Sequence, residues 1–349
     1  MNILIVKLSA IGDVIHTLPA LNAIRKHYPR AHITWLVEED AYPLLEGHAA
    51  LDRILVSKRK RWLKNPRNLS LINSIKEAYQ FIKELRDAEY DLIIDFQALL
   101  KSGVLIGLSK GKKKIGFDKG MEHMEHSYLF LNERVPSVNM NNHAILRSMM
   151  LLKSLGIHSN EIVYNLPISD QDRMRAEDLM EQHGVKESRP LVAINPLAKW
   201  NTKLWNNRKF GRLADILIER YGAGVVFTGS REDRKTIQEI IDGMELKAAN
   251  FAGKTGLKIL AALYEKADFL ISTDTGPMHL AAAVNTPVVA LFGPTAPWRT
   301  GPFGPGHRII QAGLDCSPCF KRKCETTDCM KEISVEKVLK SALKIIGKL

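Results

Sequence analysis

The sequence predicts an α/β fold made of two successive wound parallel sheets with helices on both faces. Short apolar runs rich in β-branched residues alternate with segments whose apolar residues recur at helical spacing. This pattern begins at the N-terminus and begins again near residue 191. With 349 residues, the chain is also long enough for two domains of about 150 residues each.

The first half supplies four strand candidates and two helical faces. The strands are expected at residues 3–8, 33–37, 54–56 and 92–96. One helical face comprises Ile72, Ile75, Tyr79 and Ile82, and the other comprises Ile145, Met149 and Leu152.

The second half repeats the alternation with clearer helices. Strands are expected at 191–195, 225–228, 269–273 and 288–292, and helices at 206–221, 231–243, 257–266 and 277–284. A polar stretch with a helix at 171–183 separates the halves, and an amphipathic helix at 335–346 ends the chain. We therefore expect a first domain over 1–168, a linker region over 169–189, a second domain over 190–333, and a C-terminal helix over 334–349 that packs back on the first domain. Ligands of two such domains bind in strand-end loops that line one cleft.

Composition limits the function classes. The chain has 45% hydrophobic and 25% charged residues, which excludes a disordered or disulfide-stapled protein. The first apolar run contains Lys7 and has no cleavage site, and no apolar run approaches the roughly 20 residues of a membrane span, so we expect a cytoplasmic protein. The excess of 12 positive charges favours a polyanionic partner. No nucleic-acid-binding motif is found, which favours a phosphorylated substrate or an anionic membrane surface over nucleic acid.

The loop after the first strand carries a candidate base. Gly12 and Asp13 stand at the turn into a helix, where the carboxylate would lie at the edge of the cleft. A dinucleotide site is disfavoured because the three spaced glycines are missing. On loop geometry alone, Asp13 as a mere helix cap is an equally good interpretation.

The loops of the second half suggest an anion site. The run 272–283 ends a strand at Asp274, and Thr275, Gly276 and Pro277 then begin a helix whose exposed amides suit a diphosphate. His279 lies in the first turn of that helix, although local packing explains it equally well. Lys199 and Lys203 lie in a neighbouring loop, and Glu232 follows a glycine turn where a carboxylate can accept from ribose hydroxyls.

Two further clusters stand out. Residues 58–67 carry six basic residues and no acid, and residues 110–114 carry four lysines that could touch anionic headgroups. The four cysteines are Cys316, Cys319, Cys324 and Cys329. Their spacing is equally consistent with a structural zinc site, a disulfide or free thiols.

These residues resemble the bacterial heptosyltransferases of lipopolysaccharide inner-core synthesis, glycosyltransferase family 9. The likeness rests on residues 7–20, 91–102, 274–282 and 292–295, and the runs 35–39 and 58–62 are most similar to the heptosyltransferase I branch. The resemblance implies a GT-B fold, in which two Rossmann-like domains face a central cleft. It also implies an inverting transfer of L-glycero-D-manno-heptose from ADP-heptose to the Kdo of Kdo-lipid A, on the cytoplasmic face of the inner membrane.

The resemblance also implies roles for individual residues. Asp13 corresponds to the catalytic base, and Lys203 to the lysine that binds the donor diphosphate. The other implied donor contacts are Lys199, Thr202, Glu232, Asp274, Thr275, Gly276 and His279. The implied acceptor contacts are Gly12, His16, Lys58, Arg59, Lys60 and Arg61. No metal or other cofactor is expected to be required.

Three alternatives remain open from the sequence. The first is heptosyltransferase II or another family 9 sugar transferase with a different acceptor. The second is a GT-B-like nucleotide-sugar epimerase, which needs no acceptor. The third is a noncatalytic module that binds an anionic membrane or nucleic acid through its basic residues.

Overall fold

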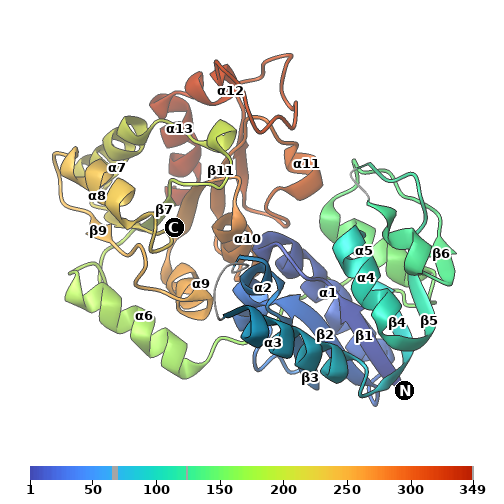
Figure 1. The fold of residues 1–349 in the computed structure, drawn as a ribbon. Coiled ribbons are helices and arrows are strands. Elements are labelled where there is room, and N and C mark those ends of the chain that lie inside the picture. Colours follow the sequence, from blue (N-terminus) through green and yellow to red (C-terminus); the bar gives the residue numbers. More distant parts are fainter. Residues whose placement is uncertain (65–69, 123–124, 348–349) are drawn as a thin grey trace. The chain divides into compact units, whose positions relative to one another are not determined.

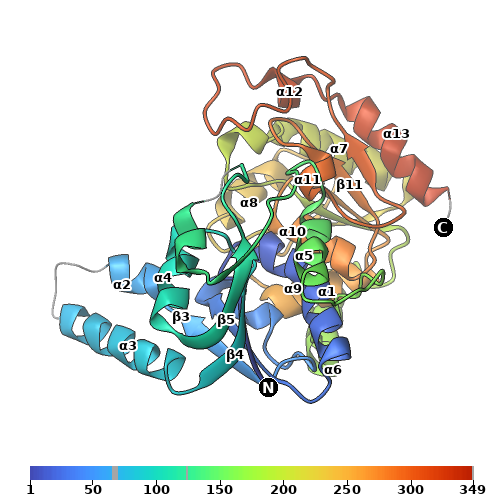
Figure 2. The same cartoon turned by 90° about the vertical axis from the view of Figure 1, so that its right-hand side faces the viewer.

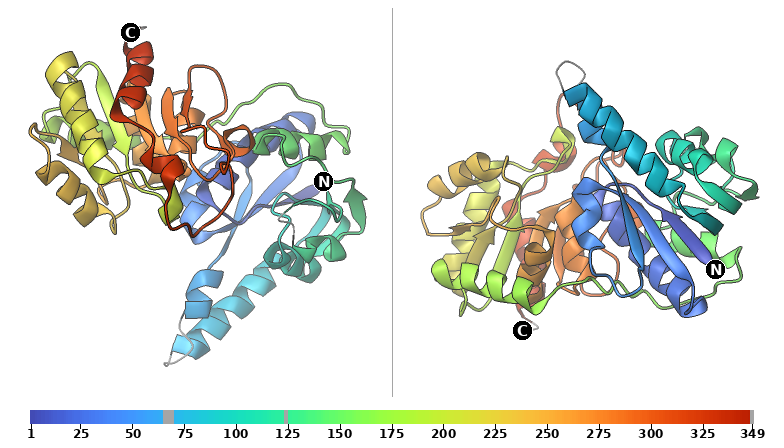
Figure 3. Two further views of the ribbon diagram at one scale, coloured as in Figure 1. Left: turned by 90° about the horizontal axis from the view of Figure 1, so that it is seen from above. Right: turned by 60° about the horizontal axis from the view of Figure 1, so that its bottom comes forward.

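The computed structural model describes residues 1–64, 70–122 and 125–347, which form two compact units, Met1–Pro167 and Ile168–Leu349. Each unit contains one six-stranded sheet, and every strand pair recorded in the sheets is parallel. Helices flank both sheets (Figure 1, Figure 3). Among the described residues, no helix is long and apolar enough to cross a membrane.

The first unit has the sheet order β3-β2-β1-β4-β5-β6. Its strands are β1 (Asn2–Val6), β2 (His32–Glu38), β3 (Arg53–Ser57), β4 (Glu89–Asp95), β5 (Lys110–Phe117) and β6 (Glu133–Val135). Its helices are α1 (Ile11–His27), α2 (Arg59–Lys64), α3 (Ser70–Leu85), α4 (Leu100–Leu108) and α5 (Ala144–Lys153), with 3-10 turns η1 (Glu39–Leu44) and η2 (His126–Phe130). Helices α1 and α5 pack together on one side of the sheet, and α2, α3 and α4 lie on the other side (Figure 2).

The second unit has the order β12-β11-β10-β7-β8-β9, which is the same topology when its strands are counted from β7. Its strands are β7 (Leu191–Asn195), β8 (Gly224–Phe227), β9 (Ala249–Asn250), β10 (Phe269–Thr273), β11 (Val288–Leu291) and β12 (Arg308–Ile310). Its helices are α6 (Asp170–Gln182), α7 (Asn207–Tyr221), α8 (Arg234–Asp242), α9 (Leu257–Lys266), α10 (Gly276–Ala283), α11 (Pro297–Thr300), α12 (Asp328–Lys331) and α13 (Val335–Ile346), with the turn η3 (Asn201–Lys203). Both units therefore have the Rossmann strand order, in which ligands bind where the order reverses, at β1/β4 and at β7/β10.

All eight strands expected from the sequence are present, with ends shifted by three residues at most. Strand β5 was not expected, because its first half is made of lysines and a glycine. Gly111 gives room to the side chain of Ile93 on β4, whose Cδ1 would lie 2.4 Å from a Cβ at position 111 and would have to move. Two lysines of β5 form ion pairs with the neighbouring strands: Lys112 pairs with Asp91 of β4, and Lys113 pairs with Glu133 of β6.

Two segments differ from the expected domain limits. Helix α6, expected in a linker region, packs on α9 of the second unit, and Arg173 pairs there with Glu265 at 2.8 Å. Helix α13, expected to pack on the first domain, packs its apolar side on α7, β11 and β12 of its own unit. Its Val338, Ala342 and Ile345 are buried there. The apolar stripe predicted the helix but not the surface that it covers.

The packing of α13 leads to a stability prediction. We expect Ile345→Ala to lower the stability of the second unit by about 2 kcal/mol, because Ile345 is buried in its core. Hydrogen exchange should accelerate in β11 and β12 and stay unchanged in β1 and β4. The control Lys344→Ala removes an exposed side chain of the same helix and should change neither. Faster exchange in β1 and β4 alone would contradict this packing.

Candidate functional site

The loop after β1 is tied to the loop after β4 at the point where the strand order reverses. The backbone N–H groups of Leu8 and Ser9 donate to Oε1 of Gln97, at 2.9 and 3.0 Å. Asp13 lies in the first turn of α1, where its Oδ2 accepts from the N–H of Ala10 at 2.9 Å. The carboxylate thus caps the helix, as the simpler interpretation expected, and it also lines a pocket beside the loop.

This pocket has a volume of about 140 Å³ and lies within the first unit. Its charged lining consists of Lys7, Asp13, Glu122 and Arg147, and His16 also lines it. The ammonium of Lys7 donates to the carbonyl of Phe96 at 2.9 Å, and burial lowers the pKa of Lys7 although Asp13 and Asp95 oppose the shift. Arg147 is held by the carbonyls of Met140 and Asn142. The pocket therefore presents two held cations, Lys7 and Arg147, and two carboxylates, Asp13 and Glu122. The cations suit an anionic group on a molecule that Asp13 touches.

The turn that positions Gln97 is built on a buried acid. Asp95 ends β4, and its Oδ1 accepts from the N–H groups of Gln97 and Ala98 at 3.0 and 3.1 Å. Burial raises the pKa of Asp95, although these hydrogen bonds oppose the shift. Because Gln97 binds the β1 loop, Asp95 fixes that loop indirectly.

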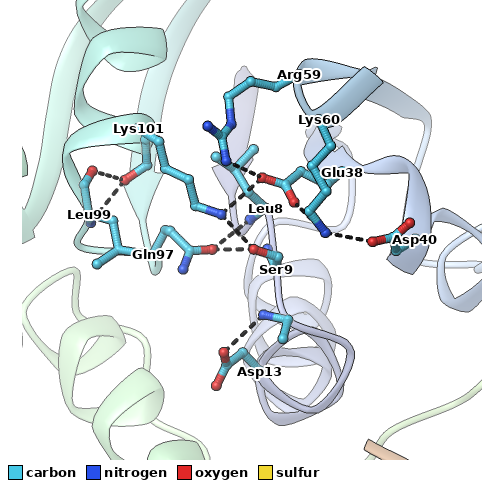
Figure 4. Close-up of polar contacts among 12 residues, drawn as sticks. Leu8, Ser9, Asp13, Glu38, Asp40, Arg59, Lys60, Gln97, Leu99 and Lys101 are labelled. Atoms are coloured by element: carbon cyan, nitrogen blue, oxygen red, sulfur yellow. Dashed lines mark hydrogen bonds and ion pairs between the residues drawn. The ribbon is translucent and has the colours of Figure 1, made fainter. Parts of the chain in front are cut away.

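A second buried acid, Glu38 at the end of β2, gathers three cations (Figure 4). Lys101 of α4 donates to it at 2.9 Å, and Lys60 and Arg59 of α2 lie 3.3 and 3.5 Å away. Lys101 also donates to Oγ of Ser9 at 2.6 Å, so the cluster reaches the loop that precedes Asp13. Burial alone would raise the pKa of Glu38, but Lys101 and Lys60 hold it below its ordinary value.

The expected acceptor cations are largely occupied by acids of the chain itself. Arg59 and Lys60 pair with Glu38, Lys60 also pairs with Asp40 at 2.5 Å, and Arg61 lies 3.6 Å from Glu77. Lys58 is half-buried just before α2. Residues 65–67 of the same basic run lie outside the described residues. Of the other expected acceptor contacts, His16 lines the pocket with Asp13, whereas Gly12 is buried in α1.

In the second unit, the loop after β10 centres on Asp274. This carboxylate is buried, and its Oδ2 accepts from Nζ of Lys203 at 2.6 Å and from Oγ1 of Thr295 at 2.7 Å. The ammonium of Lys203 also lies 4.6 Å from the centre of the Trp200 ring. The structure therefore joins two residues that the sequence assigned to one site from positions 71 residues apart. It adds Thr295, which the sequence did not assign to that site.

The remaining expected donor contacts are placed differently. Thr275 and Gly276 are half-exposed at the start of α10, and His279 is buried in its first turn. Thr202 is buried and donates to the carbonyl of Lys321 at 2.9 Å. Lys199 and Glu232 are exposed. Asp233, not Glu232, orders the glycine turn, since its Oδ2 accepts from the N–H of Ser230 at 2.8 Å.

The four cysteines are free thiols in the segment before α13. Cys316 and Cys324 are exposed, Cys319 is half-buried and Cys329 is buried. Within the described ranges, no three His, Cys, Asp or Glu side chains are arranged to hold a metal ion.

Comparisons with known proteins agree with this fold and point to one family. A family model described as glycosyltransferase family 9 (heptosyltransferase) matches residues 78–330. The chain is 31% identical over 327 residues to lipopolysaccharide heptosyltransferase 1 of Pseudomonas aeruginosa, and the aligned region covers 93% of this chain and 87% of that protein. It is 30% identical over 290 residues to lipopolysaccharide heptosyltransferase 3 of Escherichia coli, with 81% of each covered.

A solved structure bears on the fold. The E. coli heptosyltransferase WaaC with ADP matches with a TM-score of 0.77 and 24% identity, over 99% of this chain and 100% of that one. The expected α/β fold of the GT-B class, with two Rossmann-like domains, is confirmed.

The Glu38 cluster leads to a pH-dependent prediction. A carboxylate whose pKa is lowered by folding stabilises the protein fully above its unfolded pKa of about 4.5, and this contribution is lost as the pH falls through the folded pKa. We expect Glu38→Gln to destabilise the first unit by about 1–3 kcal/mol at pH 7, and the difference from the unchanged protein should shrink below about pH 4. Calorimetry at pH 7 and below about pH 4 measures this difference in the free energy of unfolding. Glu39→Gln, at an exposed neighbour, should have little effect. An equal loss at both pH values would contradict the assignment.

Proposed function

The chain belongs to glycosyltransferase family 9, and we propose that it transfers L-glycero-D-manno-heptose from ADP-heptose to the Kdo of Kdo-lipid A. Its curated relatives are lipopolysaccharide heptosyltransferases. The observation that carries the proposal is the pocket in which Asp13 lies beside the fixed cations Lys7 and Arg147. Kdo carries a carboxylate, which these cations can bind while Asp13 faces a sugar hydroxyl.

Asp13 acts as the general base in this proposal. Its carboxylate takes the proton of the acceptor hydroxyl as the hydroxyl oxygen bonds to the anomeric carbon of the heptose. The bond between that carbon and the diphosphate oxygen breaks at the same time, and ADP leaves from the opposite face. One displacement of this kind inverts the anomeric configuration. The hydrogen bond from the N–H of Ala10 holds the carboxylate in place.

The second unit supplies the donor site in this proposal. Lys203 is oriented by Asp274, and the N-terminal end of α10, where Thr275 makes no side-chain cap, faces phosphate oxygens in this proposal. Together they take up the negative charge that develops on the departing ADP. We therefore propose no metal cofactor for this step. The structure of the related WaaC protein with ADP supports an adenine nucleotide as the donor carrier.

An acceptor panel tests the reaction. ADP release is measured with purified Kdo-lipid A, with heptosyl lipid A, and with ADP-heptose alone. Release with Kdo-lipid A only is the expected result. Release with heptosyl lipid A only would favour heptosyltransferase II, and conversion of the donor without acceptor would favour an epimerase.

Substitution of Asp13 tests its role. Asp13→Asn keeps an oxygen to cap α1 but removes the base, so we expect turnover to fall by about 10² to 10⁴. Affinity for ADP should stay within about twofold, because the proposed donor contacts lie in the second unit. Steady-state kinetics and ADP titration measure the two effects. Near-normal turnover would remove Asp13 from this role.

Substitution of Lys203 tests the donor site. A hydrogen bond to a charged group contributes about 1.5–3 kcal/mol, so Lys203→Met should weaken ADP-heptose binding by about 10- to 100-fold and lower turnover. Calorimetric titration with ADP-heptose measures the affinity. The control Lys235→Met removes an exposed lysine of α8 and should bind normally. The donor assignment is wrong if both variants titrate like the unchanged protein.

A further inference from the structure

Helix α3 presents apolar side chains to solvent. Ile72 and Tyr79 are 71% exposed and Ile75 is 60% exposed, while Phe81 and Leu85 of the same helix are buried. The three exposed residues are spaced i, i+3 and i+7, so they form one stripe on the helix. Single exposed apolar residues are common on proteins, but a continuous stripe marks an interaction surface.

Helix α4 adds a second stripe beside the first. Leu100, Val104 and Leu108 are spaced i, i+4 and i+8, and all three are exposed. A groove of about 460 Å³ runs between α3 and α4. Its apolar lining includes Trp62, Phe81, Ile82, Val104 and Leu105. The two helices lie on the same side of the first sheet (Figure 2), and Leu100 and Val104 of the second stripe line the groove.

Basic side chains flank the α3 stripe, although Glu77 and Glu84 also lie on α3 and Glu125 lines the groove. Lys76 follows Ile75, and Lys83 lies one turn beyond Tyr79 on the same side of α3, and both are exposed. Arg59 and Lys101 line the groove. A helix with an apolar stripe flanked by lysines is typical of segments that lie in the interface of an anionic bilayer.

We infer that this α3–α4 face docks on an anionic phospholipid bilayer, with the stripe of Ile72, Ile75 and Tyr79 inserted at the boundary between headgroups and acyl chains. The inference rests on the proposed function, because a lipid acceptor lies in such a bilayer. Within the first unit, the groove also connects with the loop that precedes Asp13. Lys101 lines the groove, and its Nζ donates to Oγ of Ser9 at 2.6 Å, four residues before Asp13. Lys101 therefore links the groove to the loop that precedes Asp13, while the pocket of Asp13 is lined by α1 and α5 on the other side of the sheet.

Vesicle flotation of the full-length protein tests the inference without substrates. Vesicles of phosphatidylcholine are compared with vesicles that also contain about one-third phosphatidylglycerol. We expect binding to the anionic vesicles, weakened by salt. The variant Ile72→Asn/Ile75→Asn/Tyr79→Asn should lower the bound fraction by about tenfold or more, and Lys76→Gln/Lys83→Gln should lower it on anionic vesicles. The control Met174→Asn/Leu246→Asn changes exposed apolar residues of the second unit and should bind normally.

Activity measurements separate this inference from the proposed function. The triple variant should turn over a water-soluble Kdo acceptor without acyl chains at the normal rate and lose activity only on acceptor in vesicles. If the protein binds vesicles but transfers no heptose, the proposed function is overturned and the inference of a docking face still stands. Unchanged vesicle binding by the triple variant would overturn the docking face. The unchanged protein could also be a dimer that binds no vesicles and that the triple substitution converts to a monomer. This result would assign the face to a second copy of the chain and would overturn the inference of membrane docking.

Discussion

Both units depend on one constraint of their parallel sheets. With this strand order, the loops that leave the first and fourth strands turn to opposite faces, and the sheet opens between them at its carboxyl edge. Backbone groups at this opening have no neighbouring strand, so side chains must satisfy them. In the first unit, Gln97 accepts from Leu8 and Ser9. In the second, Oγ1 of Thr273, at the end of β10, donates to the carbonyl of Leu197 in the loop after β7 at 3.4 Å. Asp13 and Lys203 lie in the loops that these openings create.

Buried acids organise the charges around the first opening. Asp95 builds the turn that carries Gln97, and Glu38 collects Lys101, Lys60 and Arg59. A buried carboxylate is costly unless cations and donors surround it, so Glu38 draws α2 and α4 toward the end of β2. Lys101 extends this network to Ser9 and lines the apolar groove. One lysine thus connects the loop of the base with the face that we infer to contact lipid.

Much of this architecture could be predicted from the sequence, because apolar periodicity reports local structure. Eight of the strands in the described residues, most of the long helices and the loops with Asp13 and Asp274 follow from it. Strand β5 could not be found, since its lysines and glycines carry no apolar signal and its place depends on Asp91, Ile93 and Glu133 of neighbouring strands.

Contacts between residues that lie far apart in the sequence were the other feature that could not be predicted. The basic residues 59–61 suggested a surface ready for an acceptor, but their partners Glu38 and Glu77 lie elsewhere in the chain. The pairing of Lys101 with Glu38 spans 63 residues, and that of Thr295 with Asp274 spans 21. Spacing within a motif contains no information about such contacts. The resemblance to a family implied roles for Asp13, Lys203 and Asp274, but not the hydrogen bonds that Asp13 makes with Ala10 and Asp274 makes with Thr295.

The most direct test of the account is the anomeric configuration of the product. Heptose transferred from ADP-heptose to a Kdo acceptor can be compared with the donor by NMR, through the one-bond carbon–hydrogen coupling at the anomeric centre. A single displacement with Asp13 as base predicts complete inversion. Retained configuration would require an intermediate that this account does not contain, and would contradict it.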